Sequence, residues 1–177
     1  MSQEEFMRQQ YLTLRDEIRN AKARIFWLIV IGTLLIPAAA FAASAFDSTL
    51  ASGAIPFVVL VLMITFIAEQ NSIIRAGRYL REHVEPHIEG VIGWERWLES
   101  NRKLRSVDRI FFGAFILIFF IFYGVGTRAA LESLMVAAPG VEDMSYHWIT
   151  LGGYVAGGIF FLYVLLRHWH ACTTTLE

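Results

Sequence analysis

Four stretches of this chain are apolar and contain no Asp, Glu, Lys or Arg: residues 25–46, 54–68, 110–127 and 148–166. The hydrocarbon core of a bilayer is roughly 30 Å thick, and about 20 helical residues cross it. Because lipid offers the backbone no hydrogen-bond partner, a helix is the structure that such a stretch adopts there. With 56% hydrophobic and 18% charged residues, the chain is also too apolar for an ordinary soluble domain. The sequence therefore predicts an all-α membrane protein with four transmembrane helices.

The basic residues are distributed unevenly around these stretches. Of the fifteen Lys and Arg residues, five precede the first stretch, eight lie between the second and third, and one follows the fourth. Only Arg128 lies elsewhere. Cytosolic loops of membrane proteins carry the excess of Lys and Arg, so both termini are predicted to be cytosolic. We expect a multi-pass protein of the plasma membrane, which in bacteria is the inner membrane.

The second apolar stretch continues without a helix breaker into a charged, amphipathic segment. Read as one helix, residues 54–85 are about 48 Å long, and a bilayer core takes only roughly 30 Å of that length. Three turns or so should therefore project into the cytosol as a stalk, which Pro86 ends. Pro56 suits the first turn of this helix. A turn at 47–53 is expected to make the first two spans antiparallel neighbours.

On the cytosolic side of this hairpin, each of the two helices carries a seam, in which apolar residues recur at intervals of three or four positions. Residues 1–24 are predicted to form an amphipathic helix, and its seam faces that of the stalk as an antiparallel coiled coil. Glycine in the stalk seam would allow the two backbones to approach closely. The predicted seam residues are Tyr11, Leu14 and Ile18 on the first helix and Ile73, Gly77 and Leu80 on the stalk.

Residues 86–106 are predicted to form a short amphipathic segment on the cytosolic side. Trp94 and Trp97, with Arg102 and Lys103 following, are typical of an anchor at the level of the lipid head groups. The alternative is that the two tryptophans cap the core of the coiled coil. Both interpretations remain open at this point.

The third span, residues 110–127, is rich in phenylalanine, and Phe119 is expected to face lipid. Residues 128–147 should form the one sizeable exofacial segment, with a short helix at 129–138 across the membrane surface. Residues 167–177 should be a cytosolic tail.

The fourth span contains two glycine pairs, and Gly153 and Gly157 have the GxxxG spacing that lets membrane helices pack closely. These glycines are predicted helix-packing sites, either within one subunit or between the subunits of a homo-oligomer. They are Gly152, Gly153, Gly157 and Gly158.

Few residues of the sequence suggest a catalytic or metal-binding site. The apolar stretches hold no charged residue, which argues against a proton-coupled pump. His83 and His87 are four residues apart but flank Pro86, while His168 and His170 diverge on a helix. Nucleophile and phosphate-loop motifs are absent from the sequence. Cys172 is the only cysteine, so no intramolecular disulfide can form. We therefore expect no metal, no cofactor and no enzymatic activity.

Arg75, Arg78 and Arg81 form a basic row on the stalk. One interpretation is a solvated face near anionic lipid, and the other is a docking site for an anionic ligand or a cytosolic protein partner. The net charge of −1 argues against nucleic acid as a partner.

The segment at residues 79–88, followed by Gly93-Trp94-Glu95, resembles a segment of uncharacterised bacterial membrane proteins and implies no activity. The leading functional hypothesis is a non-enzymatic membrane module that self-associates and couples its cytosolic helices to the bilayer, as a sensor, scaffold or effector subunit. An oligomeric pore or ion channel is the second hypothesis. A membrane enzyme that uses the cytosolic histidines is the third.

Overall fold

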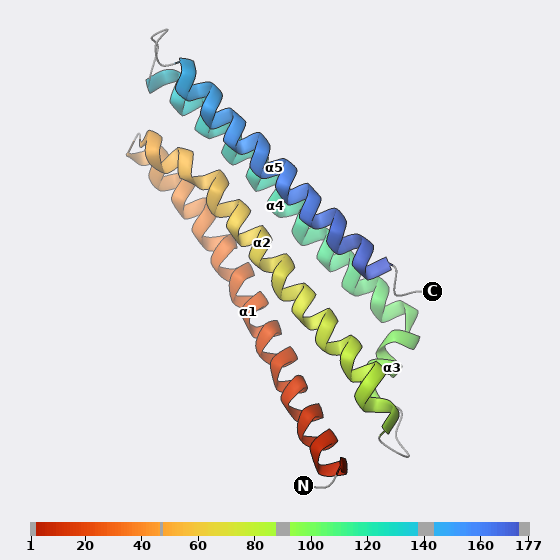
Figure 1. Ribbon diagram of the computed structural model, residues 1–177. Coiled ribbons are helices and arrows are strands. Elements are labelled where there is room, and N and C mark those ends of the chain that lie inside the picture. The colour runs from red at the N-terminus through yellow and green to blue at the C-terminus, as the bar shows by residue number, and fades with distance from the viewer. Residues whose placement is uncertain (1–2, 47, 88–92, 138–143, 174–177) are drawn as a thin grey trace. The chain divides into compact units, whose positions relative to one another are not determined.

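The computed structural model describes residues 3–46, 48–87, 93–137 and 144–173, and these residues contain helices and no strand (Figure 1). Five α-helices, one π-helical turn and one 3-10 turn follow one another. In chain order they are α1 (Gln3–Ala45), α2 (Thr49–Tyr79), the π-helical turn η1 (Leu80–Val84), the 3-10 turn η2 (Glu85–His87), α3 (Trp94–Ser100), α4 (Arg102–Ala137) and α5 (Met144–Thr173).

Four helical stretches are long and apolar enough to cross a membrane. They are Glu5–Ala45, Thr49–His87, Ile110–Val136 and His147–Trp169. Many of their large apolar side chains are exposed, as expected for helices that contact lipid on one side and neighbouring helices on the other. The structure confirms the predicted all-α fold with four helices long and apolar enough to span a membrane.

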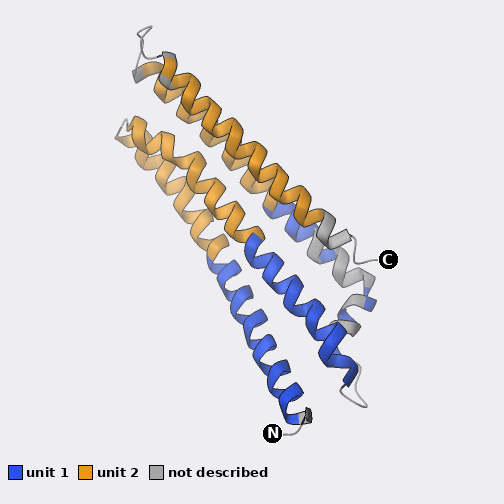
Figure 2. Ribbon diagram, viewed as in Figure 1, with its two compact units in different colours: residues 1–27, 68–115 blue, residues 28–67, 116–177 orange. Residues whose placement is uncertain are grey.

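The chain divides into two compact units (Figure 2). Unit 1 contains residues 1–27 and 68–115, and unit 2 contains residues 28–67 and 116–177. The residues of α1, α2 and α4 are shared between the units, and each of these helices is continuous across the division.

The core of unit 1 is a cluster of apolar side chains from α1, the end of α2 and η1. Its buried members are Ile18, Ala76, Leu80 and Val84, and Tyr11, Leu14 and Ile73 pack against them. Ala76, a member of this cluster, directly precedes Gly77, which the heptad pattern placed in the seam. A helix of 3.6 residues per turn places positions three and four residues from Ile73 on either side of the same seam.

The α-helical geometry of α2 ends at Tyr79 and is followed by the wider π turn. The backbone N–H of Glu85 donates to the carbonyl oxygen of Leu80, five residues earlier. Pro86 has no N–H and its ring crowds the preceding turn, which accounts for the departure from α-helical geometry just before it.

Segments of four helices form the core of unit 2. Each segment contributes deeply buried residues to this core. They include Ile36 and Ala43 on α1, Val59 and Ile67 on α2, Ala130 on α4, and Phe161 on α5. Most of these are aliphatic or small, so the helices approach one another through short side chains. 

Three features of unit 2 differ from the sequence-based expectations. Helix α2 begins at Thr49 instead of residue 54, because the Ser48 hydroxyl accepts a hydrogen bond from the Ala51 N–H and caps the helix. Residues 129–137 continue α4 instead of forming a separate surface helix. The expectation that Phe119 faces lipid is wrong, because its side chain is buried against Gly32 and Phe66.

Candidate functional site: an inter-helix cavity and the polar contacts of the two units

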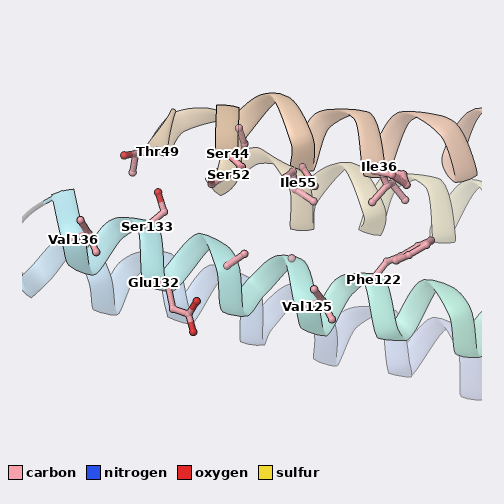
Figure 3. Close-up of a pocket in the computed structure, with 15 residues that line it drawn as sticks. Ile36, Ser44, Thr49, Ser52, Ile55, Phe122, Val125, Glu132, Ser133 and Val136 are labelled. Atoms are coloured by element: carbon pink, nitrogen blue, oxygen red, sulfur yellow. The ribbon is translucent and has the colours of Figure 1, made fainter. Parts of the chain in front are cut away.

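A cavity of about 850 Å³ lies within unit 2, between segments of α1, α2 and α4 (Figure 3). Each helix contributes residues that recur about once per helical turn, singly or as adjacent pairs. On α1 they are Ile36, Pro37, Ala40, Ala43 and Ser44; on α2, Thr49, Ser52 and Ile55; on α4, Phe122, Val125, Gly126, Ala129, Glu132, Ser133 and Val136.

The lining changes character along the helices. Ile36 and Phe122 lie at one end of the cavity, and Ile55 and Val125 lie between the ends. The polar residues of the lining lie toward the other end, where α2 begins, and in Figure 3 the Glu132 carboxylate points away from α1 and α2. Those polar residues are Ser44, Thr49, Ser52, Glu132 and Ser133. The cavity is therefore amphipathic along its length.

Small residues leave this space open. Gly126 lies close to α2, since a Cβ atom there would come within 3.1 Å of the Ile55 side chain. Further along the same faces, Ala40, Ala43 and Ala129 have side chains too short to fill the gap between the helices. Alanines on α1 and α4 thus set the width of the cavity.

The single carboxylate of the lining carries an ion pair. Glu132 Oε1 accepts a hydrogen bond from Arg128 Nε at 2.8 Å, one helical turn earlier. Both side chains remain largely exposed. The Glu132 carboxylate is therefore paired on the exposed side of α4, with a residue that is not among those lining the cavity.

The glycines of α5 differ in whether a side chain of another helix lies close to them. A Cβ atom at Gly157 would lie 2.5 Å from Leu60 Cδ1, and one at Gly153 would lie 3.8 Å from the Phe57 ring, so both approach α2. Gly158 approaches Tyr123 of α4, at 3.5 Å. Gly152 is exposed, and a Cβ there would meet no atom within 4 Å.

Two tyrosines connect three helices of unit 2. The Tyr154 hydroxyl donates to the Gly53 carbonyl oxygen at 2.8 Å, and the Tyr123 hydroxyl donates to the Tyr154 carbonyl oxygen. The Tyr154 ring is buried and lies 5.2 Å from the Phe57 ring, centroid to centroid. Sequence reasoning missed this network, because nothing in the local pattern distinguishes these tyrosines from the others.

In unit 1, polar contacts join the α1 and α2 segments beside the apolar cluster. Arg24 binds Glu69 through two hydrogen bonds of 2.8 Å, Nε to Oε1 and Nη2 to Oε2. This planar, two-point geometry is the strongest that arginine makes with a carboxylate. Gln10 Nε2 also donates to the Tyr79 hydroxyl at 2.8 Å.

The predicted anchor residues are only partly described. Trp94 and Trp97 are about half exposed, and their ring centroids lie 5.2 Å apart. The Arg15 guanidinium lies 5.8 Å from the Trp94 ring centroid, so α3 contacts the N-terminal helix. Arg102 and Lys103 are in α4, and their side chains lie outside the described residues.

The basic row on α2 and η1 does not present three equivalent cations. Arg75 is exposed, whereas Arg78 is partly buried and has an interaction partner. Arg81 pairs with Glu82 at 3.0 Å, and 17% of its side chain is exposed.

The histidines are dispersed. His83 stacks on the Tyr79 ring, and His87 Nδ1 lies 3.0 Å from the His83 carbonyl oxygen. His168 is buried in α5, and the His170 side chain lies outside the described residues. Within the part of the chain that the structure describes, no three His, Cys, Asp or Glu side chains group as metal ligands do.

These features define a helical protein with four helices suited to span a membrane. The chain matches no protein-family model, no curated protein and no solved structure. Its function is therefore argued from its own residues.

Proposed function

We propose that this protein is a non-enzymatic, self-associating membrane module that couples packed cytosolic helices to the state of the bilayer, as a sensor, scaffold or effector subunit. It is a multi-pass protein with both termini in the cytosol. The continuity of α1 and α2 carries this proposal. Each helix supplies both an apolar, membrane-suited stretch and residues of the unit 1 cluster.

A continuous helix transmits tilt or translation along its axis, because its backbone hydrogen bonds resist bending. When a bilayer becomes thinner or thicker, transmembrane helices respond by tilting. The α1 and α2 segments of unit 1 are held to each other by the apolar cluster and by the Arg24–Glu69 pair. Helix tilt in the membrane would therefore change the geometry of a packed, partly polar surface in water.

Self-association is supported by the exposed face of α5. Gly152 and Ala156 are both exposed and four residues apart, which is the small-xxx-small spacing of closely packed membrane helices. Gly152→Leu should lower the oligomeric state in nanodiscs if a second copy packs there. Val155→Leu is the matched control, because Val155 is also exposed on α5 and is not a small residue.

The coupling is tested by distances measured within unit 1 while the bilayer is changed. Spin labels at the exposed positions Arg8 and His83, in a Cys172→Ser background, report the spacing of the two helices. We expect the distance distribution to shift between bilayers of short-chain and long-chain phosphatidylcholine. Insertion of two glycines after Trp27 interrupts α1 and should abolish the shift.

Identical distance distributions in thin and thick bilayers would contradict the coupling. A conductance measurement in liposomes tests the alternative of an oligomeric pore: steady single-channel currents would favour the pore over the coupling module. Stoichiometric metal in the purified protein would favour an enzyme that uses the histidines.

A further inference from the structure

We propose that α3 is a clasp on the helix pair of unit 1, which consists of its α1 segment and its α2 segment with η1 and η2. The clasp joins α1 to η2 through Arg15 and Glu85, and it opens more easily than the apolar cluster beside it. Its two tryptophans serve the helix pair and not the lipid head groups. This role of α3 is independent of the coupling and of the self-association proposed above, and shares with them only the membrane-spanning stretches.

Two consecutive residues at the start of α3 contact both members of the helix pair. The Trp94 ring centroid lies 5.8 Å from the Arg15 guanidinium of α1, which also lies 5.5 Å from the Tyr11 ring centroid. Gly93 lies against Glu85 of η2, because a Cβ atom at Gly93 would overlap the Glu85 carboxyl group. Helix α3 also contacts η1, and Figure 1 shows α3 beside this end of the helix pair. It therefore bridges α1 and the η1–η2 segment.

The Arg24–Glu69 pair shows where the uncharged stretches of α1 and α2 end. Each of these two residues directly adjoins its uncharged stretch, so their contact brings the two ends to one level. Arg15 lies nine residues before Arg24, which is about 14 Å along a helix that rises ~1.5 Å per residue. Glu85 lies sixteen residues beyond Glu69, or about 20–25 Å by the same measure. Both contacts of α3 are therefore far from the uncharged stretches.

The head-group layer does not extend to these contacts. A bilayer is about 40–45 Å thick with its head groups and has a core of about 30 Å, so each head-group layer is about 5–8 Å thick. A helix tilt of about 40° would shorten the 14 Å to Arg15 to about 11 Å. Side chains on a helix lean toward its N-terminus, which on α1 leads away from the bilayer. Trp94 therefore lies beyond the head groups, and its position favours packing on the helix pair over anchoring in lipid.

The contacts that hold α3 are weaker than those inside the cluster. Leu80 and Val84 are fully buried, whereas Trp94 and Trp97 are 49% and 42% exposed. A helix of seven residues is not stable by itself in water. Glu85 is 5% exposed, and a buried carboxylate loses so much solvation that its contacts add little net stability. Helix α3 is therefore expected to open locally while the cluster stays packed.

The position of the tryptophans can be measured in proteoliposomes made with phosphatidylcholine brominated on its acyl chains, which quenches tryptophan fluorescence at short range. One full-length variant keeps Trp94 and Trp97, with the other three tryptophans replaced by phenylalanine. A second variant keeps only Trp27, which is exposed within the first uncharged stretch. We expect the brominated lipid to quench Trp27 severalfold more strongly than the α3 pair. Equal or stronger quenching of the α3 pair would place α3 at the membrane and overturn the assignment.

Amide hydrogen exchange in α3, measured by mass spectrometry on the full-length protein, tests the contact with η2. Gly93→Ala should raise this exchange severalfold, because the added methyl group displaces the Glu85 carboxylate. In a Glu85→Ala background the carboxylate is gone, so Gly93→Ala should add nothing further. Gly113→Ala is the matched control in unit 1, because a Cβ atom there meets no atom within 4 Å.

The contact with α1 is tested in the same way. Arg15→Gln removes the cation beside Trp94 and should also raise exchange in α3 severalfold. Arg19→Gln, at an exposed position of α1, should leave it unchanged. Wild-type exchange in either Gly93→Ala or Arg15→Gln would overturn the bridge. Exchange in wild-type α3 as slow as that of the residues around Leu80 would overturn its easier opening.

Discussion

At the scale of single residues, the contacts of α5 explain why its glycines are not equivalent. Gly157 faces the side chain of Leu60, which is buried, whereas Gly152 faces open space. A methyl group therefore has room at Gly152 and not at Gly157, although both glycines belong to the same Gly-rich stretch of α5.

Gly157→Ala should destabilise the protein by about 1–3 kcal/mol, the usual cost of forcing an extra carbon into a packed core. The added Cβ would lie 2.5 Å from Leu60 Cδ1, and the Leu60 side chain has to move. Gly152→Ala is the control and should unfold at the wild-type temperature or slightly above it, because the added methyl group meets no atom and alanine favours a helix over glycine. Equal melting temperatures for the two variants would show that α5 does not approach α2 at Gly157.

The Tyr154 hydroxyl offers a second test at this scale. Tyr154→Phe removes the hydrogen bond to the Gly53 carbonyl and keeps the ring packed on Phe57. Hydrogen bonds between membrane helices contribute about 0.6 kcal/mol on average, so a loss of that order is expected in the free energy of unfolding. Tyr163→Phe, at an exposed position, should have no measurable effect.

At the scale of elements, the important unit is the helix pair of unit 1. A single amphipathic helix is rarely stable in water, because most of its stability comes from packing its apolar face. The α1 and α2 segments each bury that face in the cluster around Leu80, which is fully buried.

Leu80→Asp should disrupt this pair, because it places a carboxylate without a partner among apolar side chains, at a cost of at least about 2 kcal/mol. We expect faster proteolysis of the N-terminal part of α1 in intact proteoliposomes. Leu12→Asp, at an exposed position of α1, is the control and should be cleaved at the wild-type rate.

Cysteines at Leu14 and Leu80, in a Cys172→Ser background, should crosslink within one chain, because both side chains belong to the same cluster. The product should run as a monomer on a denaturing gel. Crosslinking of Leu14 only to Leu14 of another copy would contradict the intrachain pair and would indicate that the helices pair between subunits.

At the scale of the whole molecule, the distribution of charge predicts the orientation in the membrane. If each of the four apolar stretches crosses the bilayer once, fourteen of the fifteen Lys and Arg residues fall on one side and Arg128 falls on the other. Reporters fused before Met1 or after Glu177 should register as cytosolic, and one inserted near Gly140 as exofacial. A cytosolic signal near Gly140 would be incompatible with four spans.

The number and approximate position of the spans could be predicted because they depend on local properties. The length of an uncharged apolar run decides whether a helix can cross a bilayer, and this length is read directly from the chain. The seam residues Leu14, Ile18 and Leu80 could also be found, since a repeat of threes and fours brings side chains to one face of a helix.

The tertiary structure alone decided which of those faces meet. Phe119 is buried because Gly32, far away in the sequence, leaves room for its ring. The cavity that Glu132 lines exists because short side chains on two distant helices fail to fill the space between them. Burial and empty space are properties of pairs of helix faces, and a pattern within one segment carries no information about the partner face.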